Sequence, residues 1–414
     1  MKSEIDEEAM WEGIKTATED PEELKVICCA LDSFLQYAKS AHFQITHQRR
    51  QAFYALPRYQ WEMLAGPPFN YLKTLDKVDA AIESNAEICR AIVKTGQPMV
   101  LPPDHQSKPG QQSSTTPHWS GWAKAADIDK ARTTVRQFYR DWTAEGASER
   151  DACYGPVIRA LVAEKASREP KSENPFKVLI PGAGLGRLVF ELCLEGFAVE
   201  GNEISYHQLL ASSYILNSCE GAGQHTIYPW VHSFSNHLTR ENHLRGYAVP
   251  DIHCGTEIAR AQLQGTIGTM SMVAADFLCL YNDHSHAVSY DAVATVFFLD
   301  TAPNLLRYLD AIFHCLKPGG ILVNLGPLLW HFENTLTNRS NDESDSDNST
   351  GGIADPGRFE LTDDEVMALV TSAGFEVVSR ETGIEAPYIH DKDSMLQMVY
   401  KASFWVARKP ETKS

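Results

Sequence analysis

The stretch VLIPGAGLGR, at positions 178–187, decides how the rest of this 414-residue chain is interpreted. An apolar strand leads into three glycines, Gly182, Gly184 and Gly186, and a helical pattern follows from Leu188. Glycine has no Cβ, so it turns sharply and lets the backbone approach a ligand closely. This succession is typical of doubly wound folds that hold a nucleoside, although the same run also fits a plain tight turn.

An acidic residue supports the first interpretation. Glu203 follows Gly182 by 21 positions, at the end of a second predicted strand over 198–202. An acid in that place accepts hydrogen bonds from ribose hydroxyls. The glycines are spaced by two, and no glycine stands at the three-residue offset of the dinucleotide fingerprint. The pattern therefore favours an adenosine ligand without bound phosphates, such as S-adenosylmethionine, over phosphate capture at a helix N-terminus.

Composition narrows the class of protein. Hydrophobic residues make up 43% of the chain, and the net charge is −17. That charge argues against a nucleic-acid or membrane-surface partner, because phosphate binding needs clustered Lys and Arg. Nine cysteines without a Cys-x-x-Cys pair indicate reduced core thiols, and no metal site is expected. The acidic first 20 residues do not resemble a signal peptide, so we expect a cytoplasmic protein, with the nucleus as a second location.

Composition also predicts the organisation of the chain. We expect a helical N-terminal region over 1–95 and a flexible linker over 96–120, rich in Pro, Gln, Ser and Thr. The main α/β domain is expected over 121–409. It contains an acidic, low-complexity insert at 338–357, which we expect to be disordered.

Strand and helix patterns alternate from Val178 onward, which predicts a parallel sheet with helices on both faces. The chain ends with a strand, a loop and a strand, which suits an antiparallel hairpin at the sheet edge. A helix from Asp363 is expected to begin at the cap Thr362 and to end at Gly374. The later strands are predicted at 270–275, 292–298, 320–325, 375–381 and 402–407.

Several long segments resemble the carnosine N-methyltransferases, a family of Rossmann-like class I methyltransferases that use S-adenosyl-L-methionine. The segments are IPGAGLGRL at 180–188, GNE at 201–203, YPWVH at 228–232, FFLDTA at 297–302, NLGPLLWHFEN at 324–334, RQFYRDW at 136–142 and ERDACY at 149–154. The resemblance covers most of residues 25–95 and 128–408, and it departs in the linker and in the acidic insert. It implies an α/β fold with a Rossmann-like sheet.

The resemblance implies a set of cofactor-binding residues. Gln137 and Arg140 reach the methionine end, Gly182 and Gly184 allow close approach, Glu203 holds the ribose, Asp276 and Phe277 hold the adenine, and Val296 makes a small backbone contact. From the residues alone, Asp276 also fits the N-cap of a following helix.

The resemblance also implies a substrate pocket lined by Asp300, His331, Tyr388 and Tyr400, with Phe297 as a wall, and it makes Asp300 and His331 the catalytic candidates. A carboxylate suits this chemistry, because accepting the N–H of an imidazole fixes the ring tautomer and raises the nucleophilicity of the other nitrogen. Simpler interpretations stay open. Asp300 fits a helix cap, His331 fits a core histidine, and both tyrosines fit packing residues.

The expected function follows from the resemblance. It is methylation of the imidazole ring of carnosine, giving anserine, or of a related histidyl dipeptide, by an enzyme that forms a homodimer. One alternative is a methyltransferase of another imidazole, such as a protein histidine. The other is a catalytically silent methyltransferase fold that serves as a binding module. The intact set of Gly182, Glu203, Asp276 and Asp300 argues against silence.

Overall fold

The computed structural model describes residues 20–100, 117–168, 174–333 and 357–411. The chain divides into two compact units. Unit 1 comprises residues 1–147, 205–257 and 389–398, and unit 2 comprises 148–204, 258–388 and 399–414. Unit 1 extends beyond the expected boundary at 121 to residue 147, and it also takes in 205–257 and 389–398. The acidic insert and the middle of the expected linker lie outside the described residues.

Unit 2 is built on a seven-stranded sheet in the order β5-β2-β1-β6-β7-β9-β8. Strands β5, β2, β1, β6 and β7 are parallel, and β9 runs antiparallel to both β7 and β8. The predicted parallel sheet with an antiparallel hairpin at its edge is confirmed. The strands are β1 (Lys177–Pro181), β2 (Ala198–Glu203), β5 (Thr269–Ala274), β6 (Tyr290–Val296), β7 (Leu316–Gly326), β8 (Glu376–Pro387) and β9 (Val399–Arg408).

The central strands are apolar because helices cover both faces of the sheet. Leu179 and Val293 belong to one hydrophobic cluster and Val178 to another, and all three are fully buried. Strands buried on both faces are continuous apolar runs, which is why the sequence located them. The helices of this unit include α7 (Ala147–Ser167), α8 (Arg187–Leu194), α12 (Phe277–Tyr281), α13 (Leu305–Cys315) and α14 (Asp363–Ser372).

Helix α14 begins and ends as its sequence predicts. Thr362 caps its N-terminus and forms a capping box with Glu365. Gly374 follows the last turn with a φ of 94°, a conformation that favours glycine.

Ion pairs join the amino ends of the strands in unit 2. Asp291 accepts from Arg168 at 2.9 Å, from Lys317 at 2.8 Å and from the Lys177 amide at 2.9 Å. Glu164 accepts from Arg408 at 2.7 and 2.8 Å, and this guanidinium lowers the pKa of Glu164. We call these side chains the amino-end network. It ties α7 to the starts of β6 and β7 and to the end of β9.

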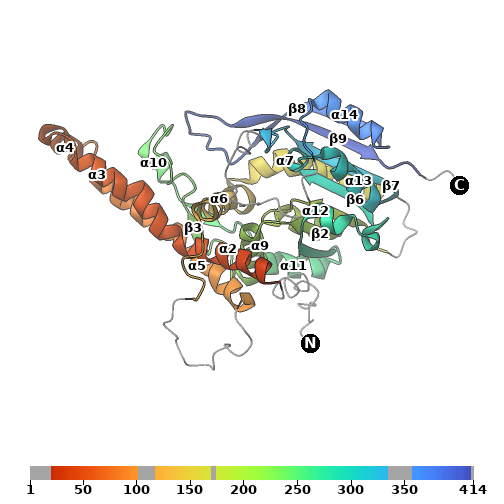
Figure 1. Ribbon diagram of the computed structural model, residues 1–414, viewed down its shortest axis with the longest axis horizontal. Coiled ribbons are helices and arrows are strands. Elements are labelled where there is room, and N and C mark those ends of the chain that lie inside the picture. Colours follow the sequence, from red (N-terminus) through yellow and green to blue (C-terminus); the bar gives the residue numbers. More distant parts are fainter. Residues whose placement is uncertain (1–19, 101–116, 169–173, 334–356, 412–414) are drawn as a thin grey trace, which may run out of the picture. The chain divides into compact units, whose positions relative to one another are not determined.

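Unit 1 contains a long helical hairpin (Figure 1). Helix α2 packs along α5, and the chain turns back through α4. The elements are α2 (Pro21–Ala41), a π-helix (His42–His47), α3 (Gln48–Tyr54), α4 (Arg58–Ala65), α5 (Tyr71–Val100), α6 (Ala125–Trp142), α9 (Tyr206–Ser213), a second π-helix (Tyr214–Ser218), β3 (His225–Ile227), α10 (Arg240–His243), β4 (Tyr247–Val249) and α11 (Cys254–Gln264), whose last residues belong to unit 2. No helix within the described ranges is long and apolar enough to cross a membrane.

Both ends of the expected linker at 96–120 are ordered parts of unit 1. Helix α5 continues to Val100, which is buried. At the other end, Trp119 is fully buried, and Asp32 on α2 accepts hydrogen bonds from the amides of Gly121 at 3.0 Å and Ala123 at 2.8 Å. The polar composition of the segment concealed these contacts, because one buried carboxylate and one tryptophan hold a stretch that is otherwise poor in apolar residues.

We predict that Asp32→Ala loosens this segment. The change leaves two backbone donors without their charged acceptor, so the free energy of unfolding should fall by about 1–3 kcal/mol. Denaturant titration measures the fall, and hydrogen exchange should show faster exchange at the Gly121 and Ala123 amides. Asp129→Ala is the matched control, since Asp129 is exposed on α6 and should change stability by less than about 0.5 kcal/mol. Unchanged exchange in Asp32→Ala would contradict the role given to this carboxylate.

Candidate active site

The sheet of unit 2 brings the predicted residues of that unit to one edge. The parallel strands β1, β2, β5, β6 and β7 end at this edge. The ends of these strands and the loops that follow them carry the predicted residues. The antiparallel hairpin reaches the same edge, because Gly326 at the end of β7 pairs with Ser403 and Pro387 at the end of β8 pairs with Val399. Open α/β sheets bind ligands outside the carboxyl ends of their strands. The topology therefore makes this edge the candidate active site.

The glycine turn after β1 has the backbone that its sequence requires. Gly182 has a φ of 66° and Gly184 a φ of 58°, in the left-handed region that favours glycine. A Cβ on Gly182 would lie 2.7 Å from Cδ2 of Phe298, so the turn also leaves no room for a side chain there. Close packing of Phe298 against the turn was not predicted, since the tight spacing of glycines does not say what fills the space.

Glu203 lies directly beside this turn. Its Oε2 accepts from the Gly184 amide and its Oε1 accepts from the Ile204 amide, both at 2.9 Å. The side chain is 7% exposed. These bonds fix the carboxylate at the end of β2, next to a turn whose backbone a ligand can approach. This held acceptor fits an adenosine cofactor, because a carboxylate in that place accepts hydrogen bonds from both ribose hydroxyls.

The other predicted adenine-side residues have structural partners as well. Asp276 caps α12 by accepting from the Cys279 amide at 2.9 Å, so the capping interpretation is confirmed. Phe277 is buried and its ring lies 5.6 Å from that of Phe298. Val296 is the last residue of β6. Their contacts with a cofactor stay predictions.

Gln137 and Arg140 lie on α6 in unit 1. Gln137 is buried, and Arg140 pairs with the buried Asp141 at 2.9 Å. The ion pair fixes the direction of the Arg140 side chain. The approach of these two residues to the methionine end of a cofactor stays a prediction.

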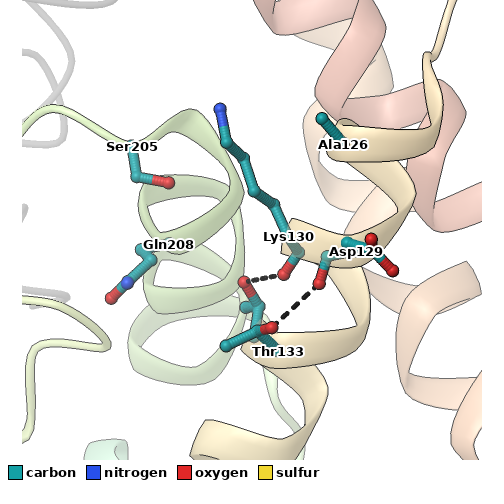
Figure 2. Close-up of a pocket in the computed structure, with 7 residues that line it drawn as sticks. Ala126, Asp129, Lys130, Thr133, Ser205 and Gln208 are labelled. Atoms are coloured by element: carbon teal, nitrogen blue, oxygen red, sulfur yellow. Dashed lines mark hydrogen bonds between the residues drawn. The ribbon is translucent and has the colours of Figure 1, made fainter. Parts of the chain in front are cut away.

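A cavity of about 350 Å³ lies between α6 and α9 in unit 1, on the same helix as Gln137 (Figure 2). The side-chain oxygen of Gln208 is buried there without a hydrogen-bond partner among the described residues. Thr133 and Thr134 turn their hydroxyls back to the α6 carbonyls, each at 2.9 Å. None of its residues was predicted from the sequence. The lining is Ala126, Asp129, Lys130, Thr133, Thr134, Ser205 and Gln208.

Asp300 is a buried carboxylate at the candidate active site. It lies in a short 3₁₀ helix (Leu299–Thr301) after β6, is 3% exposed, and its Oδ2 accepts from the Leu329 amide at 3.0 Å. Burial raises the pKa of Asp300, and the Leu329 donor and nearby His331 act in the opposite direction. The helix-cap interpretation is wrong, because Asn304 caps the next helix, α13.

Three aromatic rings lie at the same edge. The ring of Phe297 lies 5.1 Å from that of Tyr388 and 5.8 Å from that of Tyr400, and the two tyrosine rings are 6.4 Å apart. Phe297 has a φ of 53°, which is uncommon for a bulky residue and marks a constrained loop. Burial raises the pKa of Tyr400, as do Tyr388 and Asp300. Phe297 lies three residues before Asp300, so one ring of this cluster belongs to the same loop after β6 as the carboxylate.

His331 is exposed, so the core-histidine interpretation is wrong. Its amide donates to the Asp300 carbonyl at 3.4 Å, which brings the turn that carries it next to Asp300. The structure thus gathers Asp300, Phe297, Tyr388 and Tyr400 with the turn of His331. The sequence did not predict the hydrogen bond from the Leu329 amide to Asp300, because any residue type except proline supplies a backbone donor.

Comparisons with known proteins agree with this geometry. The family model for carnosine N-methyltransferase matches residues 117–411. A Schizosaccharomyces pombe carnosine N-methyltransferase is 35% identical over 95% of this chain and 98% of its own. A Mus musculus carnosine N-methyltransferase is 32% identical over 92% of this chain and 85% of its own. A solved Burkholderia thailandensis 1,6-didemethyltoxoflavin-N1-methyltransferase is 18% identical over 73% of this chain and 93% of its own, with a TM-score of 0.34, too low to support an inference.

The sheet order, the glycine turn with its acidic partner and the relatives together define a Rossmann-like methyltransferase. More narrowly, the chain belongs to the carnosine N-methyltransferase family.

We predict that Glu203→Gln weakens binding of S-adenosylmethionine by about ten- to a hundredfold. The amide removes the charged acceptor, and hydrogen bonds to charged groups contribute about 1.5–3 kcal/mol. Calorimetric titration measures the affinity. Glu195→Gln, an exposed acid directly after α8, should bind as the unaltered protein does. If a folded Glu203→Gln protein binds S-adenosylmethionine as tightly as the unaltered protein, Glu203 does not bind the cofactor.

Proposed function

We propose that this protein transfers a methyl group from S-adenosylmethionine to the imidazole ring of carnosine, giving anserine, or to that of a related histidyl dipeptide. The observation that carries the proposal is the Asp300 carboxylate. It is buried, its Oδ2 accepts from the Leu329 amide, and it lies on the loop after β6 that also carries Phe297 of the aromatic cluster. Membership of the family supports the choice of carnosine.

Asp300 and the aromatic cluster bind and orient the imidazole that accepts the methyl group. A neutral imidazole attacks only through its unprotonated nitrogen. Asp300 accepts the N–H of the other nitrogen, which selects the tautomer and directs the lone pair. The carboxylate then stabilises the positive charge that develops on the ring. Phe297, Tyr388 and Tyr400 present aromatic surfaces to that ring, and aromatic faces also attract cations.

The cofactor would be held by Glu203 and the glycine turn, with Asp276, Phe277, Val296, Gln137 and Arg140 as further candidates. When bound, S-adenosylmethionine supplies a methyl group on a positively charged sulfur. The residues of the chain align the acceptor for in-line attack, which is the main contribution that such a transfer needs from a protein. The ring N–H proton passes to Asp300, and exposed His331 beside it leads that proton to solvent.

The resemblance adds two expectations about the protein in the cell. We propose that it acts in the cytoplasm, with the nucleus as a second location, and that it forms a homodimer. Light scattering at micromolar concentration measures the mass of the particle and tests the second expectation.

We predict that Asp300→Asn lowers single-turnover methylation of carnosine by about 10²–10⁴-fold, the range for a positioned acid–base group. The amide cannot accept the ring N–H as a carboxylate does, and it favours the wrong tautomer. Cofactor affinity should stay within about twofold, since Glu203 holds the ribose. Asp310→Asn, an exposed acid on α13, is the control and should keep its activity. A near-normal rate in Asp300→Asn would exclude this mechanism.

The pH dependence of stability gives a second test of Asp300. Its folded-state pKa is raised above the unfolded value, so the native state binds a proton more readily than the unfolded chain does. Stability from this group is therefore present in acid and is lost as the pH rises through the folded-state pKa. We predict that Asp300→Asn is at least as stable as the unaltered protein at pH 7, and that any advantage disappears below the usual pKa of aspartate. Thermal melts across pH measure this. A variant that is less stable at pH 7 would show that Asp300 serves folding.

A further inference from the structure

Phe298 connects the predicted cofactor side of the candidate active site with the loop of Asp300. Its ring packs against the glycine turn, because a Cβ on Gly182 would lie 2.7 Å from its Cδ2 and 3.4 Å from its Cε2. The residue is buried and belongs to the same hydrophobic cluster as Phe277. No role for Phe298 followed from the sequence.

Two further rings hold Phe298 from the side of α12 and α13. Its ring lies 5.6 Å from that of Phe277 at an interplanar angle of 80°, which is an edge-to-face contact. It lies 5.4 Å from the ring of Tyr308 on α13, and the rings of Phe277 and Tyr308 are also 5.4 Å apart. Because protein interiors are close-packed, a displacement of Phe298 displaces Phe277 as well.

The backbone of Phe298 belongs to the turn that carries Asp300. Its carbonyl accepts from the Thr301 amide at 3.0 Å and from the Thr301 hydroxyl at 2.6 Å, and Asp300 lies inside the turn that these bonds close. One residue earlier, the Phe297 amide donates to the Leu325 carbonyl at 3.0 Å, which anchors the start of the loop to β7. One hydrogen-bonded turn therefore carries both the Phe298 ring and the Asp300 carboxylate.

Resting on the proposed function, we propose that Phe298 is a positioning residue that aligns the methyl donor with the imidazole. Its ring fixes the glycine turn and Phe277 on the donor side, and its turn fixes Asp300 on the acceptor side. In-line transfer depends on this alignment, since a misplacement of about 1 Å costs about 10²-fold in rate.

The same arrangement couples the two binding events. When one ligand orders an element that the second ligand also needs, the second binds more tightly, and the effect is reciprocal. Phe298 is in contact with the predicted cofactor residues Gly182 and Phe277, and it shares a turn with Asp300. Cofactor binding therefore orders the turn of Asp300 and favours the binding of carnosine.

The test measures the affinity for carnosine by calorimetry with and without S-adenosylhomocysteine, which is the cofactor after loss of its methyl group. In the unaltered protein, S-adenosylhomocysteine should tighten carnosine binding by about 5–150-fold, the usual range for coupled sites. Phe298→Leu should reduce this coupling factor to less than about twofold, because the shorter side chain leaves the glycine turn and Phe277 without support. Single-turnover methylation of carnosine should fall by about 10–10²-fold in the same variant.

Phe375→Leu is the matched control. Phe375 is buried in the same hydrophobic cluster and directly precedes β8, whose first residue pairs with Arg408 at the amino end of the sheet. Both substitutions shorten a buried ring, so both should lower the melting temperature to a similar extent. Phe375→Leu should keep the coupling factor and the rate of the unaltered protein.

Three results overturn the proposal. In the first, S-adenosylhomocysteine does not change the affinity of the unaltered protein for carnosine. In the second, Phe298→Leu keeps the coupling factor of the unaltered protein. In the third, Phe375→Leu loses coupling as fully as Phe298→Leu does, because the loss would then follow from reduced stability alone.

A second variant serves if Phe298→Leu does not fold. Phe298→Met fills the space with a flexible side chain, so it should fold and still lose the coupling that a rigid ring provides. Full coupling in Phe298→Met overturns the proposal in the same way.

The two proposals fail differently. If the unaltered protein binds S-adenosylhomocysteine and does not methylate carnosine or a related histidyl dipeptide, the proposed function fails. If it methylates carnosine, and Phe298→Leu does so at the same rate and with the same coupling factor, only the role of Phe298 is lost.

Discussion

The parallel pairing of β1 with β2 on one side and β6 on the other is the constraint on which the candidate site depends. Because the strands run in one direction, every loop that leaves them opens at the same edge. The parallel direction of the strands is therefore enough to bring residues from Gly182 to His331 to one edge of the sheet. The hairpin of β8 and β9 then adds Tyr388 and Tyr400 at that edge, since its antiparallel register returns both tyrosines to the end of β7.

Much of the architecture of unit 2 was accessible from the sequence, for reasons that are local. Strands buried on both faces appear as apolar runs, and the cap Thr362 and the terminator Gly374 have residue types with narrow uses. The division into units was not accessible. It depends on contacts between distant segments, such as the carboxylate of Asp32 with the amides of Gly121 and Ala123. A polar segment held by one carboxylate has the composition of a linker.

The identities of the site residues came from the resemblance, and the structure decided among their simpler interpretations. Asn304 takes the capping role that Asp300 also fitted, and the exposure of His331 excludes a core role. Asp276, by contrast, is a helix cap as its position allowed. What no pattern indicated was the backbone: the positive φ of Phe297 and the Leu329 amide that holds Asp300. Residue type alone predicts neither the torsion angle of Phe297 nor the main-chain donor that Asp300 uses.

The position of the amino-end network means that substitutions affecting stability and substitutions affecting the candidate active site fall at opposite ends of the sheet. At that end, Asp291 and Glu164 are paired with Lys317, Arg168 and Arg408, whereas at the other end lies the buried aspartate that we propose for the chemistry. Changes among the paired charges alter folding stability and lie far along the strands from the reacting groups. A laboratory evolution campaign can therefore raise the heat tolerance of this scaffold at one end of the sheet. The stability gained there would then offset the cost of substitutions in the proposed substrate site at the other end.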